Sequence, residues 1–178
     1  MVRAINESSR SASQILDHAM VMYRSDQFDA GPVDLSVLTA SVLRAIRPLA
    51  EMRDITIVAR GLDSACPVVA DERMLEIALR NILDNAVKYS DADGRITLDL
   101  ARQGREAVLT LADEGRGFQG DPSRLLDRFH RGANVGDVAG SGLGLTIVAE
   151  VAAAHRGRFR LTPRDTGGTC AVLSLPLA

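Results

Sequence analysis

Apolar residues recur at helical spacing near the start of the chain, over residues 5–25. The narrow stripe consists of two seven-residue series, namely Ile5, Ala12 and Ala19, and Ser8, Ile15 and Met22. A seam of this kind predicts a helix in a bundle or coiled coil. Because a short helix with small seam residues is marginal alone, we expect something outside this segment, or a second copy, to cover the seam.

Longer apolar stripes and alternating stretches follow a linker that is predicted at residues 25–34. Helices are predicted at residues 34–52, 72–89 and 143–155. Asp34 and Asp71 are good caps for the first two, and Pro48 is expected to kink or end the first. Strands are predicted at residues 54–60, 67–70, 95–101, 107–113, 159–163 and 169–175. These elements predict an α/β fold with two layers, three helices beside a mostly antiparallel or mixed sheet, plus the N-terminal helix.

Composition narrows the possible classes of function. The 178 residues fit one domain with an appendage, and the hydrophobic content of 46% is that of a globular protein. A net charge of −2 gives no electrostatic argument for a nucleic-acid partner. Cys66 and Cys170 lack the spacing of a metal or redox motif, and we expect both to be reduced core residues of a cytoplasmic protein. No apolar stretch approaches the ~18 residues that a membrane span needs.

A polar stripe interrupts the apolar helix predicted at residues 72–89. Asn81, Asn85 and Lys88 fall on one face of this helix. Amide oxygens can bind a hard cation, and amide and ammonium nitrogens can bind phosphate oxygens. The alternative is a solvated surface, but Asn is a poor helix former and an ordinary exposed face favours Glu, Lys or Gln. The stripe therefore predicts a site for a cation and phosphate.

Three segments that contain paired or alternating glycines follow this helix along the chain. Asp113 ends a predicted strand just before two glycines, so its carboxylate can accept a hydrogen bond from an amine such as that of adenine. The sequence GSGLGL at 140–145 precedes a helix and offers N–H groups to phosphate, although it matches neither a Rossmann fingerprint nor a Walker A loop. The sequence DTGGTC at 165–170 enters the last strand. Each segment taken alone is also compatible with an ordinary turn or flexible loop.

In this order, the segments resemble the five sequence boxes of the catalytic ATP-binding domain of sensor histidine kinases, which belongs to a superfamily with gyrase, Hsp90 and MutL. The matching stretches are NILDNAVKYS (81–90), DEGRG (113–117), LLDRFHRG (125–132), GSGLGL (140–145) and TGGT (166–169). The resemblance covers residues 33–178 and implies a two-layer sandwich of a mixed sheet backed by three helices, the Bergerat-type ATP-binding fold. It also implies that the protein binds ATP with Mg²⁺.

The resemblance implies a role for each matching residue. Phosphate and Mg²⁺ binding is implied for Asn81, Asn85, Lys88, Arg131, Gly140, Ser141, Gly142, Leu143, Gly144 and Leu145. Contact with the base or the adenine end is implied for Tyr89, Asp113, Gly115, Gly117 and Thr169. Among these, Asn85 helped by Asn81 would hold Mg²⁺, and Asn81, Lys88 and Arg131 would assist the transfer step. Residues 119–139 are predicted to form the ATP lid.

Asn81 distinguishes between branches of this superfamily. Hydrolysing members and anti-sigma serine kinases carry a Glu four residues before the Mg²⁺-binding Asn, where it acts as a base, but here that residue is Asn81. An amide cannot take a proton at neutral pH, so the sequence favours phosphoryl transfer to an external nucleophile over hydrolysis. Glu76 lies five residues before Asn81 and is expected to face away from the polar stripe.

The sequence contains no H box, the motif that carries the phospho-accepting histidine. His18 lacks the acidic residue and the proline that follow this histidine in the family, and His130 and His155 are expected to have structural roles at the surface. We therefore predict two parts. Residues 1–30 form a partial dimerisation and phosphoacceptor-region helix with a linker, and residues 31–178 form the catalytic ATP-binding domain.

The predicted function is transfer of the γ-phosphoryl group of Mg-ATP to a histidine on the dimerisation domain of a two-component sensor kinase. The expected partners are ATP or ADP, the domain with the acceptor histidine and a response regulator, without nucleic acid. Autophosphorylation by this chain alone is not expected. The whole protein is expected to be a homodimer in the cytoplasm, with an inner-membrane anchor left open. The alternatives are a degenerate ATP-binding or protein-interaction module and, less favoured, an ATPase or anti-sigma serine kinase.

Overall fold

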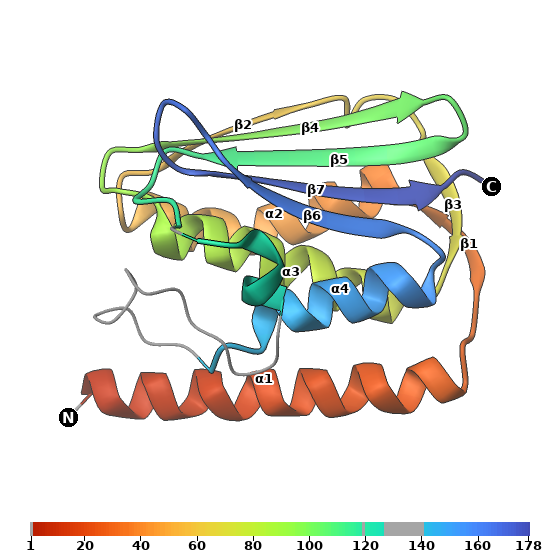
Figure 1. Ribbon diagram of the computed structural model, residues 1–178, viewed down its shortest axis with the longest axis horizontal. Coiled ribbons are helices and arrows are strands. Elements are labelled where there is room, and N and C mark those ends of the chain that lie inside the picture. Colours follow the sequence, from red (N-terminus) through yellow and green to blue (C-terminus); the bar gives the residue numbers. More distant parts are fainter. Residues whose placement is uncertain (1, 119, 127–140) are drawn as a thin grey trace.

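A computed structural model describes residues 2–118, 120–126 and 141–178, with the backbone alone for residues 2–11, 26 and 123. The elements in chain order are α1 (Val2–Asp26), β1 (Gly31–Asp34), α2 (Leu35–Glu51), β2 (Thr56–Arg60), β3 (Pro67–Ala70), α3 (Glu72–Tyr89), β4 (Arg95–Gln103), β5 (Glu106–Asp113), the 3-10 helix η1 (Pro122–Leu126), α4 (Gly144–Ala154), β6 (Arg158–Pro163) and β7 (Thr169–Pro176). Figure 1 shows a sheet with α2, α3 and α4 on one face, and α1 on the side of these helices that lies away from the sheet.

The main sheet has five strands in the order β2-β4-β5-β7-β6. β2 runs parallel to β4, and the other neighbouring pairs are antiparallel. Apolar side chains alternate along these strands, and the buried ones include Ile96, Leu98, Leu100, Leu109, Leu111, Phe159, Leu161, Leu173 and Leu175. Burial of this face against the three helices holds the two layers together. The predicted α/β sandwich, with a mixed sheet, three helices and an N-terminal helix, is confirmed.

A second, two-stranded antiparallel sheet joins β1 to β3. The sequence predicted β3 but placed residues 25–34 in a linker, so β1 corrects that prediction. Val33 is the one buried side chain of this four-residue strand, which also contains a glycine and a proline. Pairing with β3 therefore makes these residues a strand, since their own pattern is that of a loop.

Helix α2 continues past Pro48 and ends at Glu51, so the proline does not end the helix at its own position. Pro48 has no N–H to donate, but it lies in the last turn of the helix. Its carbonyl still accepts the N–H of Met52 at 3.1 Å. The proline therefore removes one hydrogen bond near the end of α2, and the helix stops within one turn.

Asp34 caps α2, as predicted. Its Oδ1 accepts the N–H of Ser36 at 3.0 Å and the N–H of Cys66 at 3.0 Å. Hydrogen bonds from Cys66 and Ser36 lower the pKa of the Asp34 carboxyl below its ordinary value. One carboxylate thus begins α2 and ties it to the loop that leads into β3.

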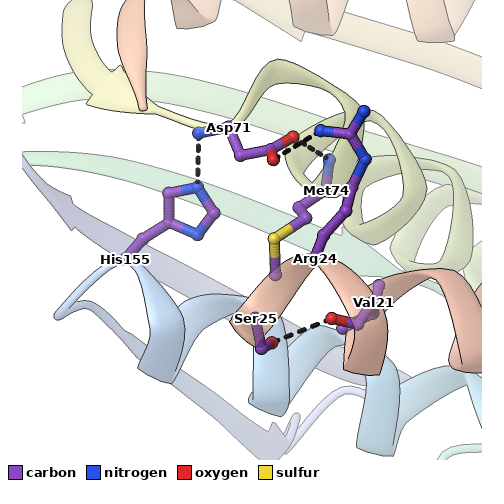
Figure 2. Close-up of polar contacts among 6 residues, drawn as sticks. All are labelled: Val21, Arg24, Ser25, Asp71, Met74 and His155. Atoms are coloured by element: carbon purple, nitrogen blue, oxygen red, sulfur yellow. Dashed lines mark hydrogen bonds and ion pairs between the residues drawn. The ribbon is translucent and has the colours of Figure 1, made fainter. Parts of the chain in front are cut away.

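Asp71 caps α3 and is almost completely buried, with 1% of its surface exposed. Its Oδ1 accepts the N–H of Met74 at 3.1 Å, and its Oδ2 pairs with the guanidinium of Arg24 on α1 at 2.7 Å (Figure 2). The carboxylate therefore has two tasks, because it starts the helix that carries the polar stripe and it holds the end of α1.

His155 contacts the backbone of Asp71, the residue that caps α3. Its Nε2 accepts the N–H of Asp71 at 3.0 Å, while its Nδ1 lies 2.7 Å from the carbonyl oxygen of Val151. These contacts require a neutral ring with its proton on Nδ1, and burial lowers the pKa of the imidazole. His155 is buried, so the predicted surface position is wrong. The residue is part of the core beneath the start of α3.

Helix α1 packs along α4 and touches α3. Its inward face comprises fully buried Val21 and the partly buried Gln14, Asp17, His18 and Arg24. The predicted apolar seam faces the other way, with Ile15 59% exposed and Met22 45% exposed. The expected cover of this seam, by a segment outside residues 5–25 or by a second copy of the chain, remains a prediction. Within the described ranges, α1 and the other helices lack the combination of length and apolarity needed to cross a bilayer.

Asp71→Ala is expected to destabilise the protein, because it removes the cap of α3 and the partner of Arg24. Asp71→Asn is the matched control, since Asn caps a helix about as well as Asp but carries no charge. We expect the alanine variant to lose about 1 kcal/mol more of the free energy of unfolding than the asparagine variant. Urea denaturation followed by circular dichroism measures both. Equal losses would contradict the capping role.

Candidate functional site

A pocket between the sheet and helices α3 and α4 gathers most of the residues that the sequence singled out. The polar side chains that line it are Gln14, Asn85, Lys88, Asp113, Ser141 and Thr169. The large apolar side chains include Ile82, Leu111, Phe118, Leu125, Leu145 and Leu161. A concave, mostly apolar pocket with a few fixed polar groups is the usual form of a small-molecule site.

Helix α3 presents the polar stripe to this pocket. Asn85 and Lys88 line the wall, whereas Asn81 lies behind it with 6% of its surface exposed. Asn81 donates from Nδ2 to the carbonyl of Ile77 at 2.9 Å, which fixes the orientation of its amide. Its Oδ1 then points towards the first residue of α4, Gly144, where a Cβ atom would lie 2.9 Å from it.

The C-terminal end of α3 is clamped by Arg53, which the sequence did not single out. Its guanidinium donates to the carbonyl of Val87, to the carbonyl of Lys88 at 2.9 Å and to that of Ser90 at 2.9 Å. The last carbonyls of a helix have no partner within the helix, and a cation there is also favoured by the helix dipole. Arg53 thus fixes the backbone that carries Lys88 and Tyr89 into the pocket.

Asp113 lies at the end of β5 and is buried, with 5% of its surface exposed. Its Oδ1 accepts the N–H of Gly115 at 3.1 Å and the N–H of Thr169 at 3.1 Å. Burial raises the pKa of the carboxyl, and the two N–H donors and the nearby Arg164 partly oppose this rise. Arg164 also donates to the Asp113 carbonyl at 2.5 Å. The carboxylate is therefore held rigidly where it faces the pocket.

Gly168 allows Asp113 and Thr169 to approach each other. Its φ is +89°, which favours glycine, and a Cβ atom there would collide with the backbone carbonyl of Asp113. Gly115 has a similar role on the opposite side, since a Cβ atom there would collide with the carbonyl of Tyr89. These glycines bring the ends of β5, β7 and α3 together around the pocket.

Three carboxamide side chains meet at the start of α4. A Cβ atom on Gly144 would lie 2.9 Å from Asn81 Oδ1, 3.4 Å from Asn85 Nδ2 and 3.6 Å from Gln14 Nε2. Next to them, Ser141 accepts the N–H of Leu143 at 3.2 Å, and Gly142 has a φ of +74°. The absence of a side chain at Gly144 leaves room for these amides.

Comparison with known proteins gives the family of this fold and pocket. Residues 70–178 match the family model described as histidine kinase-, DNA gyrase B-, and HSP90-like ATPase. This match covers more than half of the chain. The chain belongs to this family. This match, together with the sensor kinases described next, confirms the resemblance to the ATP-binding catalytic domain of sensor histidine kinases.

Individual relatives in this ATPase family are sensor kinases. The sensor-like histidine kinase SenX3 of Mycobacterium tuberculosis is 32% identical over 147 residues, which are 81% of this chain and 36% of SenX3. The solved structure of the mycobacterial sensor histidine kinase MprB is 29% identical with a TM-score of 0.72, covering 84% of this chain and 98% of that chain.

A structure of full-length ShkA in complex with AMPPNP is 27% identical with a TM-score of 0.78, covering 99% of this chain and 38% of ShkA. The chain thus spans well under half of the length of SenX3 and ShkA.

The structure brings together most of the residues expected to form the ATP site of the family. Those that line the pocket are Asn85, Lys88, Tyr89, Asp113, Gly117, Ser141, Gly142, Gly144, Leu145 and Thr169. Asn81, Gly115 and Leu143 lie just behind the wall and are buried. Arg131 and Gly140, and most of the expected lid at 119–139, lie outside the described residues.

Sequence analysis missed several residues that line the pocket or adjoin it. The apolar wall residues Ile82, Leu111 and Leu161 could not be separated from ordinary core positions, because they follow the same periodicity. Gln14 is on a helix that the sequence placed in a separate region, and Arg53 comes after α2 with no motif around it. Their roles depend on tertiary contacts.

Asp113→Asn is expected to fold and to be at least as stable as the wild type at neutral pH. Since burial raises the native pKa of Asp113 above 3.8, ionising it costs folding free energy as pH rises through that native value. Asn accepts the same N–H groups without that cost. The stability difference should shrink as pH falls and disappear below the unfolded-state pKa. Thermal unfolding across pH measures it, and a less stable variant at neutral pH would contradict it.

Proposed function

We propose that this chain is the catalytic, ATP-binding part of a two-component sensor histidine kinase. It binds Mg-ATP and transfers the γ-phosphoryl group to a histidine of a dimerisation domain, from which a response regulator receives it. The observation that supports this most is the pocket. It is lined by the buried Asp113 and by the polar side chains of Asn85 and Lys88 on α3, and the rest of its wall is mainly apolar. The match to ShkA, whose structure holds the ATP analogue AMPPNP, supports the same ligand.

The adenine end of the nucleotide is proposed to contact Asp113. An ionised carboxylate accepts hydrogen bonds only, so it suits the exocyclic amine of adenine. Leu111 and Leu161 line the same pocket and offer apolar contacts to a flat ring, with Tyr89 alongside. Because Oδ1 of Asp113 already accepts two N–H groups, the carboxylate is fixed before any ligand arrives. Such preorganisation reduces the cost of ordering on binding.

The phosphate end is proposed to lie against Asn85, Lys88 and the segment that begins at Ser141. The Nζ atom of Lys88 lies 5.0 Å from the centre of the Tyr89 ring and so stands at the pocket wall. Ammonium and amide N–H groups suit phosphate oxygens, which accept only. Arg131 is proposed to add a further cation, although it lies outside the described residues.

Asn81 and Asn85 are proposed to help hold a magnesium ion that also binds phosphates, because an amide oxygen can bind Mg²⁺. The Oδ1 atom of Asn81 is oriented towards Gly144, whereas Asn85 turns its Nδ2 atom there, so binding of the ion by Asn85 would use the oxygen on the opposite side of that amide. In the described part of the chain, no three His, Cys, Asp or Glu side chains gather. This suits Mg²⁺, which is commonly held by few protein oxygens together with substrate phosphates and water. When bound, the ion would neutralise charge on the transferring phosphoryl group.

The proposed reaction is transfer and not hydrolysis. An imidazole nitrogen of the acceptor histidine forms a bond to the γ-phosphorus while the bond from that phosphorus to the ADP oxygen breaks. Asn81 cannot remove a proton from water at neutral pH. Glu76, the preceding carboxylate on α3, pairs with Arg80 at 2.8 Å and does not line the pocket. Asp84, directly before Asn85, does not line the pocket either, so no carboxylate of α3 stands at the pocket wall to act as a base for water.

The acceptor histidine is proposed to come from a dimerisation domain that associates with this chain. His18 lies 3.2 Å from Glu150 on α4, and His155 is buried beneath α3. Residues 1–30 are proposed to belong to the dimerisation region and residues 31–178 to the catalytic domain. The whole protein is proposed to be a cytoplasmic or membrane-anchored homodimer, in which the exposed seam of α1 is covered.

Asn85→Ala is expected to weaken Mg-ATP binding at least about tenfold, because hydrogen bonds to charged groups contribute about 1.5–3 kcal/mol. Isothermal titration with Mg-ATP and Mg-ADP measures this, and the wild type should bind both in the micromolar to sub-millimolar range. Glu76→Gln is the control on the same helix and should bind as the wild type does. Absence of nucleotide binding by the wild type would overturn the proposal.

Unchanged affinity in the Asn85→Ala variant would support a module that does not use this site. Steady phosphate release that Glu76→Gln abolishes would instead support a hydrolysing enzyme. A separately produced domain with an acceptor histidine tests the transfer itself. Radiolabelled phosphate should then appear on that domain and not on this chain.

Gly144→Ala tests the space beside Gly144, around which the amides of Asn81, Asn85 and Gln14 lie. The added Cβ atom would lie 2.9 Å from Asn81 Oδ1, so we expect the Asn81 amide to shift and the affinity for Mg-ATP to fall. Gly31→Ala is the matched control, since nothing lies within 4 Å of the added atom and Gly31 does not line the pocket. Titration of both variants measures the effect. Equal affinities for Mg-ATP in the two variants would contradict the assignment of this space to the phosphate end.

A further inference from the structure

Helix α1 is attached to the rest of the chain by polar contacts at three levels. These contacts are Gln14 with Ser141, His18 with Glu150, and Arg24 with Asp71. Between the last two levels, Val21 is completely buried. The contact at one end is the cap of α3, drawn in Figure 2, and the contact at the other end is the edge of the pocket. One helix therefore connects the start of α3 with the segment that enters α4.

The oxygen and the nitrogen of the Gln14 amide lie against different residues at the pocket. Its Oε1 accepts the hydroxyl proton of Ser141 at 2.5 Å, and that same Oγ accepts the N–H of Leu143. Its Nε2 lies on the side of Gly144, 3.6 Å from where a Cβ atom would stand. The side chain itself lines the pocket. The amide thus holds the backbone before α4 with its oxygen, while its Nε2 lies beside Gly144, which also lines the pocket.

We propose that Gln14 is a nucleotide-site residue supplied by α1, which holds Ser141 and donates to a phosphate oxygen, so that nucleotide affinity depends on α1 being docked. This inference rests on the proposed function. A phosphate oxygen accepts hydrogen bonds only, so an amide N–H is a suitable partner and a carboxylate at the same position is not. Holding Ser141 also reduces the freedom of a segment that contains Gly142, whose φ is +74°.

The same arrangement couples the two ends of α1. Gln14 and Arg24 are ten residues apart, which is roughly 15 Å along a helix. If the nucleotide binds more tightly to the docked form, it must stabilise docking by the same factor. Loss of the Arg24–Asp71 pair therefore weakens nucleotide binding without touching the pocket. This loss of affinity requires Gln14, because Gln14 is the residue through which α1 contacts the nucleotide in this proposal.

The first test compares Gln14→Ala and Gln14→Glu by titration of the full chain with Mg-ATP. Gln14→Ala should weaken binding about tenfold or more, since the lost hydrogen bond is one to a charged phosphate oxygen. Gln14→Glu should weaken it at least as much, because Glu can still accept from Ser141 but cannot donate to phosphate. Ser13→Ala, at an exposed neighbouring position on α1, should bind normally. Wild-type affinity in Gln14→Glu would overturn the donor role.

The second test is a double-mutant cycle with Arg24→Ala. On the wild-type background this substitution should weaken Mg-ATP binding severalfold, and on the Gln14→Ala background it should have almost no further effect. Additive effects would overturn the coupling through α1. Unfolding by urea is measured for each variant, so that a general loss of structure is distinguished from a change in affinity.

A third measurement needs no nucleotide and separates this inference from the proposed function. Hydrogen exchange of the Leu143 amide should be faster in Gln14→Ala than in Ser13→Ala, because Ser141 loses its anchor. Unchanged exchange would overturn the anchoring role even if ATP binds. Absence of ATP binding by the wild type would overturn both the proposed function and the donor role of Gln14. The exchange result would then decide the anchoring role alone.

Discussion

Helix α3 carries the polar stripe of the pocket, and a charged side chain fixes it at each end. Asp71 accepts the N–H group of Met74 in its first turn, and Arg53 donates to carbonyls at its last turn. Both partners come from chain segments outside the helix or at its border. These contacts restrain both ends of the helix, and they thereby restrain the position of Asn81 and Asn85 relative to α4. The geometry around Gly144 depends on this constraint.

Much of this architecture could be predicted from sequence. Helices α2 and α3 begin at the predicted capping residues Asp34 and Asp71, and the alternating strands fall within a few residues of their predicted bounds. These features are local, since a cap and a period of hydrophobic residues are both set by neighbours in the chain. The polar residues of α3 could be placed on one face for the same reason.

The features that the sequence mispredicted or missed share a different cause, because each of them depends on contacts between segments that are distant in the chain. Gly31–Asp34 has the composition of a loop and becomes a strand only through β3. His155 follows an apolar helix in a sequence that suggests a surface turn, yet the N–H of Asp71, 84 residues away, holds it in the core. Gln14 reaches Ser141 from a helix with no motif at that position. Periodicity cannot predict such contacts.

The ribbon of β1 and β3 connects α1 with α3. Only residues 27–30 separate α1 from β1, and Asp71 follows directly after β3. The two strands pair antiparallel over their four residues. The chain thus joins the end of α1 to the start of α3 through a hydrogen-bonded ribbon, in addition to the direct pair of Arg24 with Asp71.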